Sequence, residues 1–280
     1  MKTLLGWILL FGISPTFAAD KPVVRWLTID FPPHHIVTGK DAGQGIRDKF
    51  LRKLHTELPE FDHRIEYSSN SRTEALMKAG EPVCTVAKIK TPEREAFSVF
   101  SRDPFLRQLP ARLVGMRATE LLKKHLIDDQ VALGPLLLSG EASFGLIRAR
   151  RYGDAIDRLL VTAPKNVITY YDADAALSTS LNLVNLQRVD FTLGYSAELE
   201  YQRRNGTLNI ELSYVPIKES NQLVAVQVSC AKSALGQAVI DAVDRQPKNR
   251  ASVREVVADY EALLPAREKQ RYSAMRARGE

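Results

Sequence analysis

The sequence predicts an α/β fold with mainly parallel sheets flanked by helices. Short apolar, β-branched runs alternate along the chain with segments whose apolar residues recur at helical spacing. Such β-α-β alternation places parallel strands side by side and helices on the faces of the sheet. The composition is typical of a globular protein, with 45% apolar and 26% charged residues among 280. This length is enough for one large domain or for two lobes of ordinary size.

The expected strands are apolar runs bounded by proline, glycine or polar turn residues. They cover residues 23–29, 64–67, 83–89, 111–116, 143–147, 167–171, 189–193 and 223–228. The first strand stops at Pro32 and Pro33, which also hold the backbone extended.

The expected helices are segments with one apolar face. They cover residues 46–58, 72–79, 91–95, 121–126, 154–160, 173–186, 235–243 and 252–264. Ser71 is placed to cap the second helix and Gly80 to end it. Thr91 and Pro92 suit the cap and first position of the third. The highly charged tail from Ala266 predicts a frayed helix.

The N-terminus has the order of a secretory signal peptide. Lys2 is followed by an apolar run from Leu4 to Phe11, and small residues precede a cleavage point after Ala18. The run is too short to span a bilayer. We expect residues 1–18 to be a signal peptide and the mature chain to work in the periplasm. The alternative is an N-terminal apolar strand or an anchor.

The net charge is +6, which indicates general surface charge or an anionic ligand in a protein that is exported. We expect no nucleic-acid partner, because an exported protein rarely meets nucleic acid. We also expect no transmembrane segment in the mature chain, because no other stretch is long and apolar enough. His34 and His35 lack partners at metal-site spacing, so no metal and no cofactor is expected. The mature protein is expected to be a monomer.

Two cysteines, Cys84 and Cys230, lie far apart in the sequence. In an oxidising compartment such a pair suggests one disulfide. The alternatives are two buried free thiols or a catalytic cysteine, and neither residue has a local activating motif.

Two motifs resemble a known family. The turn Thr91–Glu95, with the sequence TPERE, is followed by Phe100–Phe105, with the sequence FSRDPF. This order resembles the type 2 periplasmic solute-binding proteins, the amino-acid-type binding proteins of ABC importers, with one extra residue before Pro104. Gln187–Phe191 resembles the family's step into a strand of its second lobe, with glutamine in place of glycine. The resemblance is specific in the first lobe and thin in the second.

The resemblance implies a two-lobed fold. Lobe 1 would hold residues 19–110 and 212–280, and lobe 2 residues 111–211. Both cysteines would then lie in lobe 1, which is compatible with a bridge. Two crossings would act as a hinge, and a ligand would lie in the cleft between the lobes.

The resemblance also implies site residues in lobe 1. Arg94 would hold a ligand carboxylate, since a guanidinium offers two parallel donors to it. Thr91 would add a hydroxyl and helix-start N–H groups, and Phe31 would place an aromatic ring against the ligand. The alternatives are a simple cap at Thr91, a local ion pair of Arg94 with Glu93 or Glu95, and a core position for Phe31.

In lobe 2, Arg148, Arg150 and Arg151 lie between an expected strand and helix, followed by Tyr152. Such loops lie at the carboxyl edge of a parallel sheet, where α/β proteins bind ligands. A solvated charge run is the alternative. Tyr195 stands near the place where amino-acid binders of the family carry an aspartate. A neutral tyrosine cannot offset a buried ammonium, which favours a carboxylate, another anion, or an aromatic or peptide-like ligand.

These observations predict a periplasmic solute-binding protein that closes over a small anionic or carboxylate-bearing ligand. It would serve ABC import through a permease, or sensing. No Ser-His-Asp order, glycine-rich phosphate loop or metal set indicates catalysis, so no enzyme activity is expected. The alternatives are an exported enzyme on the same scaffold, using Glu93, Glu95, Asp103 or His34, and a partner-binding module that docks through the tail from Ala266.

Overall fold

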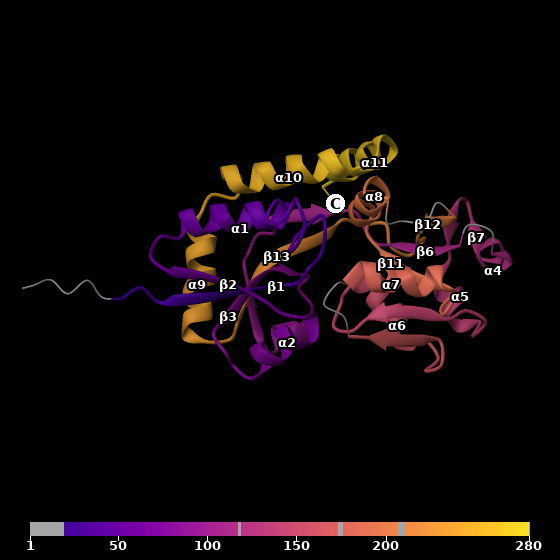
Figure 1. Cartoon of the computed structure of the whole chain (residues 1–280), viewed down its shortest axis with the longest axis horizontal. Coiled ribbons are helices and arrows are strands. Elements are labelled where there is room, and N and C mark those ends of the chain that lie inside the picture. The colour runs from indigo at the N-terminus through magenta and orange to yellow at the C-terminus, as the bar shows by residue number, and fades with distance from the viewer. Residues whose placement is uncertain (1–19, 117–118, 173–175, 207–210, 280) are drawn as a thin grey trace, which may run out of the picture.

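The computed structural model describes residues 20–116, 119–172, 176–206 and 211–279, so the expected signal peptide lies outside the described residues. Two α/β bodies lie side by side (Figure 1). We name them lobe 1 (residues 20–108 and 224–279) and lobe 2 (residues 112–216). Each lobe has its own large mixed sheet, and helices pack against the faces of both. The expected two-lobed α/β fold is therefore confirmed.

The sheet of lobe 1 has three parallel strands at one side and antiparallel pairing at the other. Its main order is β2 (Asp62–Tyr67), β1 (Val23–Thr28), β3 (Val83–Lys88), β13 (Val224–Ala231) and β4 (Ser98–Phe100), and β5 (Leu106–Gln108) also pairs with β13. The helices are α1 (Ile46–Glu57), α2 (Asn70–Lys78), α3 (Pro92–Glu95), α9 (Ala234–Arg245), α10 (Ala251–Leu263) and α11 (Ala266–Ala277).

The sheet of lobe 2 is built in the same mixed way. Its order is β10 (Ile168–Tyr171), β9 (Phe144–Ile147), β11 (Phe191–Gly194), β6 (Arg112–Met116) and β12 (Leu212–Pro216). The helices are α4 (Glu120–Lys124), α5 (Leu133–Leu138), α6 (Asp154–Thr162), α7 (Ala176–Asn185) and α8 (Ser196–Arg204). A small ribbon of β7 (Leu126–Ile127) and β8 (Gln130–Val131) lies outside the sheet.

The chain crosses between the lobes twice, after β5 and after β12. The second crossing comes later than the expected boundary at residue 212, because residues 212–216 form an edge strand on β6 of lobe 2. Leu212 and Val215 pack into the cores of lobe 2, which explains why this segment stays there. Lobe 1 therefore resumes only at β13.

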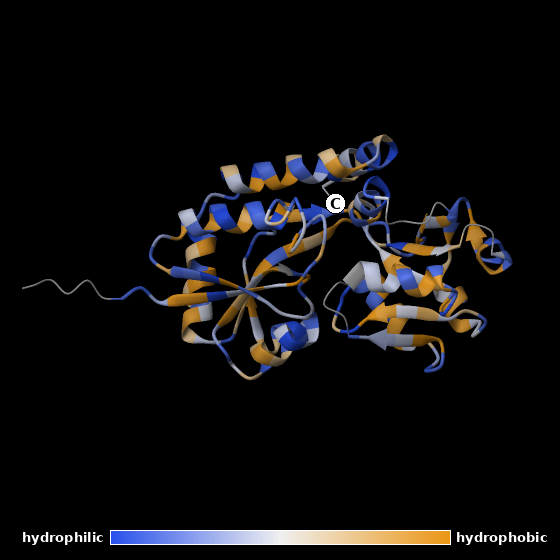
Figure 2. Cartoon of the chain, in the orientation of Figure 1, coloured by the Kyte–Doolittle hydropathy of each residue, from blue (hydrophilic) through white to orange (hydrophobic). Residues whose placement is uncertain are grey.

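Each lobe buries a core of its own. Trp26 and Phe50 are among the largest buried side chains of lobe 1, and Phe144 and Phe191 are among those of lobe 2. Along α1 and α10 hydrophilic and hydrophobic residues alternate around each helix, as expected for helices with one buried face (Figure 2). None of the helices that the structure describes is long and apolar enough to cross a bilayer.

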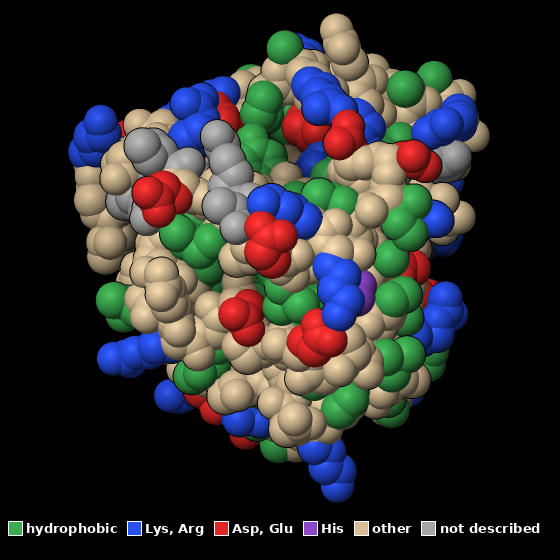
Figure 3. Space-filling model, turned by 90° about the vertical axis from the view of Figure 1, so that its right-hand side faces the viewer, with side chains coloured by type: hydrophobic (Ala, Val, Ile, Leu, Met, Phe, Trp, Pro, Cys, Tyr) green, Lys and Arg blue, Asp and Glu red, His purple; other side chains and the backbone are tan. Residues whose placement is uncertain are grey.

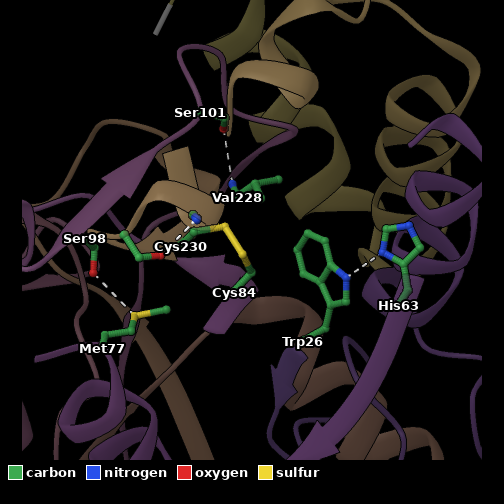
Figure 4. The surroundings of a disulfide bond; sticks show 10 residues. Trp26, His63, Met77, Cys84, Ser98, Ser101, Val228 and Cys230 are labelled. Atoms are coloured by element: carbon green, nitrogen blue, oxygen red, sulfur yellow. Dashed lines mark hydrogen bonds between the residues drawn. A yellow bond between two sulfur atoms is a disulfide. The ribbon is translucent and has the colours of Figure 1, made fainter. Parts of the chain in front are cut away.

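Cys84 and Cys230 form a disulfide, as expected, with a Cα–Cα distance of 4.0 Å. They lie directly opposite each other on β3 and β13, the central neighbours of the lobe 1 sheet. Figure 4 shows the bond close to Trp26, whose indole N–H donates to His63 Nδ1 at 3.0 Å. The bridge therefore joins the two separate segments of lobe 1.

Two local expectations were wrong. Ser69 rather than Ser71 caps α2, because its hydroxyl accepts from the Arg72 N–H at 3.2 Å. The tail from Ala266 is a packed helix, not a frayed one, since Glu268 and Tyr272 of α11 are buried. Their partners lie at the crossing into lobe 2. Glu268 pairs with Arg112, and the Tyr272 hydroxyl donates to the Arg107 carbonyl at 2.8 Å.

Candidate ligand-binding site between the lobes

A cavity of about 50 Å³ lies between the two lobes. Most of the residues that line it follow or end the parallel strands β1 and β3 of lobe 1 and β9 and β11 of lobe 2. This is the edge at which open α/β sheets bind ligands. Its lining consists of Ile29, Phe31, Arg47, Asn70, Lys88, Ile89, Arg94, Gln108 and Val226 from lobe 1, and Ala149, Arg150, Arg151 and Tyr195 from lobe 2.

Arg94, in the short helix α3, lines the cavity and is 3% exposed. The helix α3 begins just after Thr91, whose hydroxyl caps it by accepting from the Arg94 N–H at 3.3 Å. The Nε and Nη2 of Arg94 donate to Glu74 Oε1 at 2.9 and 2.7 Å. Nη2 also reaches across the cleft to the Ala149 carbonyl at 2.8 Å. The ion-pair partner of Arg94 is thus Glu74, and neither Glu93 nor Glu95.

Lys88, the last residue of β3, shares Glu74 with Arg94, at 3.4 Å from Nζ to Oε1. Burial and the charge of Arg94 outweigh the attraction of Glu74 and lower the pKa of Lys88 to about 7. The Lys88 ammonium is therefore poised to gain or lose a proton near neutral pH. At Glu74 the balance is reversed. Burial would raise the pKa of its carboxyl, but the attraction of Lys88 and Arg94 outweighs burial and lowers the pKa.

Arg47, in the first turn of α1, is 3% exposed. Among the described residues its guanidinium has no hydrogen bond or ion pair, and its Nε is buried without a partner. The Phe31 ring lies 5.6 Å from the guanidinium carbon. Burial lowers the pKa of Arg47 to about 10, although the charge of Glu198 opposes this. Arg47 is thus a buried cation without a paired anion, facing a cavity.

Arg150 of lobe 2 is held by Glu198, from α8, with Nη2 at 2.9 and 2.8 Å from the two carboxylate oxygens. Burial lowers the pKa of Arg150, but the charge of Glu198 outweighs it, so the pKa is raised and the guanidinium stays charged. Glu198 lies three residues after Tyr195. Position 195 carries a tyrosine in place of an aspartate, but one turn later Glu198 supplies a buried carboxylate. This carboxylate neutralises Arg150 of the same chain.

The remaining predicted residues separate into two groups. Arg151 lines the cavity and pairs across the cleft with Glu93, and Tyr195 lines it and donates its hydroxyl to the Arg151 carbonyl at 3.3 Å. Tyr152 is fully buried behind Tyr195, with the two rings stacked at 6.4 Å. Arg148 points away from the cavity, because its side chain is 54% exposed and pairs with Asp172.

The structure thus brings Phe31, Arg94, Arg151 and Tyr195 together at the cavity, with Thr91 and Tyr152 just behind. It does not bring Arg148 there.

The prediction missed Arg47, Lys88, Glu74 and Glu198, and it mentioned Arg150 only within the arginine cluster. A signal existed for Arg47, which shares the apolar stripe of α1 with Phe50, Leu51 and Leu54. A charged residue on such a stripe needs a reason to be buried. No comparable signal marks the pairing of Glu198 with Arg150, which depends on how β9 and α8 meet in space.

Among the described residues, five cationic side chains line the cavity and no carboxylate does. Glu74 and Glu198 lie behind the lining and face Arg94, Lys88 and Arg150. By contrast, on the face shown in Figure 3, basic and acidic side chains are interspersed. The described residues contain no cluster of three or more metal-ligand side chains.

Solved structures share this architecture. The chain superimposes on the substrate-binding protein of an amino acid ABC transporter with a TM-score of 0.59, 14% identity, and coverage of 86% of this chain and 96% of that one. The chain has the two-lobed fold of type 2 periplasmic binding proteins. The periplasmic VFT2 domain of Bordetella pertussis BvgS matches with a TM-score of 0.61, 17% identity, and coverage of 86% and 94%.

A histidine kinase sensor domain with similarity to periplasmic binding proteins matches with a TM-score of 0.63, 13% identity, and coverage of 87% and 94%. No protein-family model matches the chain, and no curated protein matches its sequence significantly. At these identities the likeness concerns the fold.

Proposed function

We propose that this protein is a periplasmic solute-binding protein whose lobes close over a small anion, in the service of ABC import or of sensing. Proteins of both kinds, a transporter's substrate-binding protein and a kinase sensor domain, share its fold. The signal-like N-terminus supports export to the periplasm. We propose further that it acts as a monomer, with an ABC permease or a sensor as its partner.

The observation that carries this proposal is Arg47. A buried guanidinium without a carboxylate, phosphate or hydrogen-bonding partner is costly in a folded protein. Arg47 faces the same cavity as Lys88, Arg94 and Arg151. An anion in that cavity would supply the missing countercharge and accept charge-assisted hydrogen bonds.

The size of the cavity limits the ligand. One water needs at least about 10–15 Å³ of such volume, so about 50 Å³ admits a group of a few non-hydrogen atoms. A short carboxylate such as formate or acetate, or the carboxylate end of a larger solute that reaches out of the cleft, has this size. A groove along Thr91, Arg151 and α6 lies next to the cavity and offers such an exit.

The proposal includes no catalytic step. Three of the four side chains considered as acid or base are engaged in ion pairs, Glu93 with Arg151, Glu95 with Lys90 and Asp103 with Lys248. The fourth, His34, is buried and does not line the cavity. A bound solute should therefore be recovered chemically unchanged after incubation, which mass spectrometry would check.

A thermal-shift titration tests the proposal. Formate, acetate and phosphate are the probes, and acetamide is the uncharged counterpart of acetate. At least one anion should raise the melting temperature of the mature protein by about 3–5 °C at ten times its Kd, and acetamide should not. Arg94→Ala and Arg47→Met should lose the effect. Arg148→Ala, from the exposed end of the arginine cluster, should keep it. Stabilisation that survives in both cleft variants would refute this site.

A further inference from the structure

The side chain of Arg150 lies in a cage of aromatic rings. Its guanidinium carbon is 4.8 Å from the ring centre of Phe31, 5.2 Å from that of Tyr152 and 5.4 Å from that of Tyr195. The carboxylate of Glu198 holds Nη2 through both of its oxygens. Aromatic faces within about 6 Å of a cation, together with one carboxylate, form a recognition site for a guanidinium or alkylammonium group.

The cage is assembled from both lobes. Phe31 comes from the loop after β1 in lobe 1, whereas Tyr152, Tyr195 and Glu198 belong to lobe 2. Arg150 itself extends from lobe 2, so its contact with Phe31 exists only while the lobes are together. The guanidinium therefore makes a contact between the lobes as well as contacts within lobe 2.

The backbone beside Arg150 is bent to make these contacts. Ala149 has a φ of 58°, in the left-handed region that residues other than glycine rarely adopt. This conformation places the Ala149 carbonyl against Arg94 of lobe 1 and the Arg150 side chain in the cage. Strain of this kind persists where surrounding contacts hold the residue in place.

Other contacts also join lobe 1 to lobe 2 across the cleft. Arg151 pairs with Glu93, Ser71 donates to Asp172 at 2.6 Å, and Ile29 packs against Ile147. The side chains of Arg150 and Glu198 are 6% and 0% exposed, and that of Arg94, which contacts the Ala149 carbonyl across the cleft, is 4% exposed. Among the cations of the described residues at the lobe interface, Arg150 is thus the one whose guanidinium lies within about 6 Å of three aromatic rings.

We propose that the cleft contains a guanidinium-binding cage which the protein fills with its own Arg150, so that this side chain acts as a tethered guest that holds the lobes together. An external ligand then has to bring only an anion, because the place for a cationic group is taken. The inference concerns the same cleft as the proposed function, but it does not require that an anion binds there.

Chemical rescue tests the tethered guest. Arg150→Ala keeps Cβ and removes a fragment equivalent to ethylguanidinium, which is the probe. Ethylguanidinium should raise the melting temperature of Arg150→Ala by about 3–5 °C at ten times its Kd. It should not raise that of the wild type, whose cage is full. Arg148→Ala, which lacks the same fragment at an exposed site, is the matched control and should not respond.

Small-angle scattering supplies a second readout. The radius of gyration of Arg150→Ala should exceed that of the wild type and return toward it when ethylguanidinium is added. No rescue of Arg150→Ala beyond that of Arg148→Ala, or an unchanged radius of gyration, would overturn the inference. If Arg150→Ala does not fold, Phe31→Leu opens the cage from lobe 1 and should also increase the radius. An unchanged radius in that variant would overturn it equally.

These outcomes are separate from those of the anion titration. A wild type that binds none of the tested anions would remove the proposed function and leave a positive rescue result standing. An anion that stabilises the wild type, combined with no rescue in Arg150→Ala, would remove the tethered guest alone.

Discussion

Replacing Arg47 by methionine should make the protein more stable and unable to bind the proposed anion. The side chain is buried without an anionic partner, and burial lowers its pKa to about 10. Each pKa unit corresponds to about 1.4 kcal/mol, so keeping this group charged in the folded state costs about 3 kcal/mol. The contact with the Phe31 ring offsets about 1 kcal/mol of that cost.

Methionine preserves much of the volume of the side chain and removes the charge. The net gain is then about 2 kcal/mol in the free energy of unfolding, or about 4–8 °C in melting temperature for a chain of this size. Thermal and urea denaturation of the protein, without added anion, would measure it. Arg52→Met is the matched control, because Arg52 is an exposed residue of the same helix. It should change stability by less than about 0.5 kcal/mol.

A loss of stability in Arg47→Met would refute the reasoning, because it would show that the charge is compensated in the folded protein. An unchanged response to anions would separately refute the role of Arg47 in binding.

Three further predictions follow from buried groups. Because the pKa of Lys88 is lowered to about 7, the unfolded chain binds more protons above pH 7, so stability should rise from pH 7 toward the ordinary lysine range. Anion affinity should fall over the same range, by up to about tenfold per pH unit. Lys88→Met should abolish the pH dependence of stability, measured by denaturation, and that of anion affinity, measured by titration. Burial lowers the pKa of His34 well below its usual value, so stability should be lost as the pH falls below about 6.5. His34→Phe should flatten that loss, and an identical acid profile would contradict it. Removing the disulfide with Cys84→Ala and Cys230→Ala should cost about 2–5 kcal/mol in denaturation experiments, whereas equal stability of the double variant would show that the bridge adds nothing.

Local chemistry made much of the fold predictable. The strands leading into the cleft, β1, β3 and β9, were recognised because β-branched and apolar runs end at proline, glycine or charged residues. The cap at Thr91 was also recognised, because threonine followed by proline suits a helix start. Signals of this kind are complete within a few residues of sequence.

What depended on distant partners was not predictable. The tail from Ala266 is highly charged, and its contacts in space, such as those of Glu268 and Tyr272 with the crossing into lobe 2, explain why it is an ordered helix. The sequence pattern indicated Arg94 as a ligand contact, and Arg94 lines the cavity, but its partner Glu74 lies 20 residues earlier on another helix. Pairings of this type are set by how the elements pack, which no local pattern encodes.

The bridge between Cys84 and Cys230 spans 146 residues and so encloses lobe 2 with both crossings inside one covalent loop. A protease that cuts once anywhere inside the loop therefore leaves the two fragments attached. The nicked protein should migrate as one species on a non-reducing gel and as two after reduction. A single proteolytic cut on the exposed surface of lobe 2 would thus not release either fragment of the chain from the other.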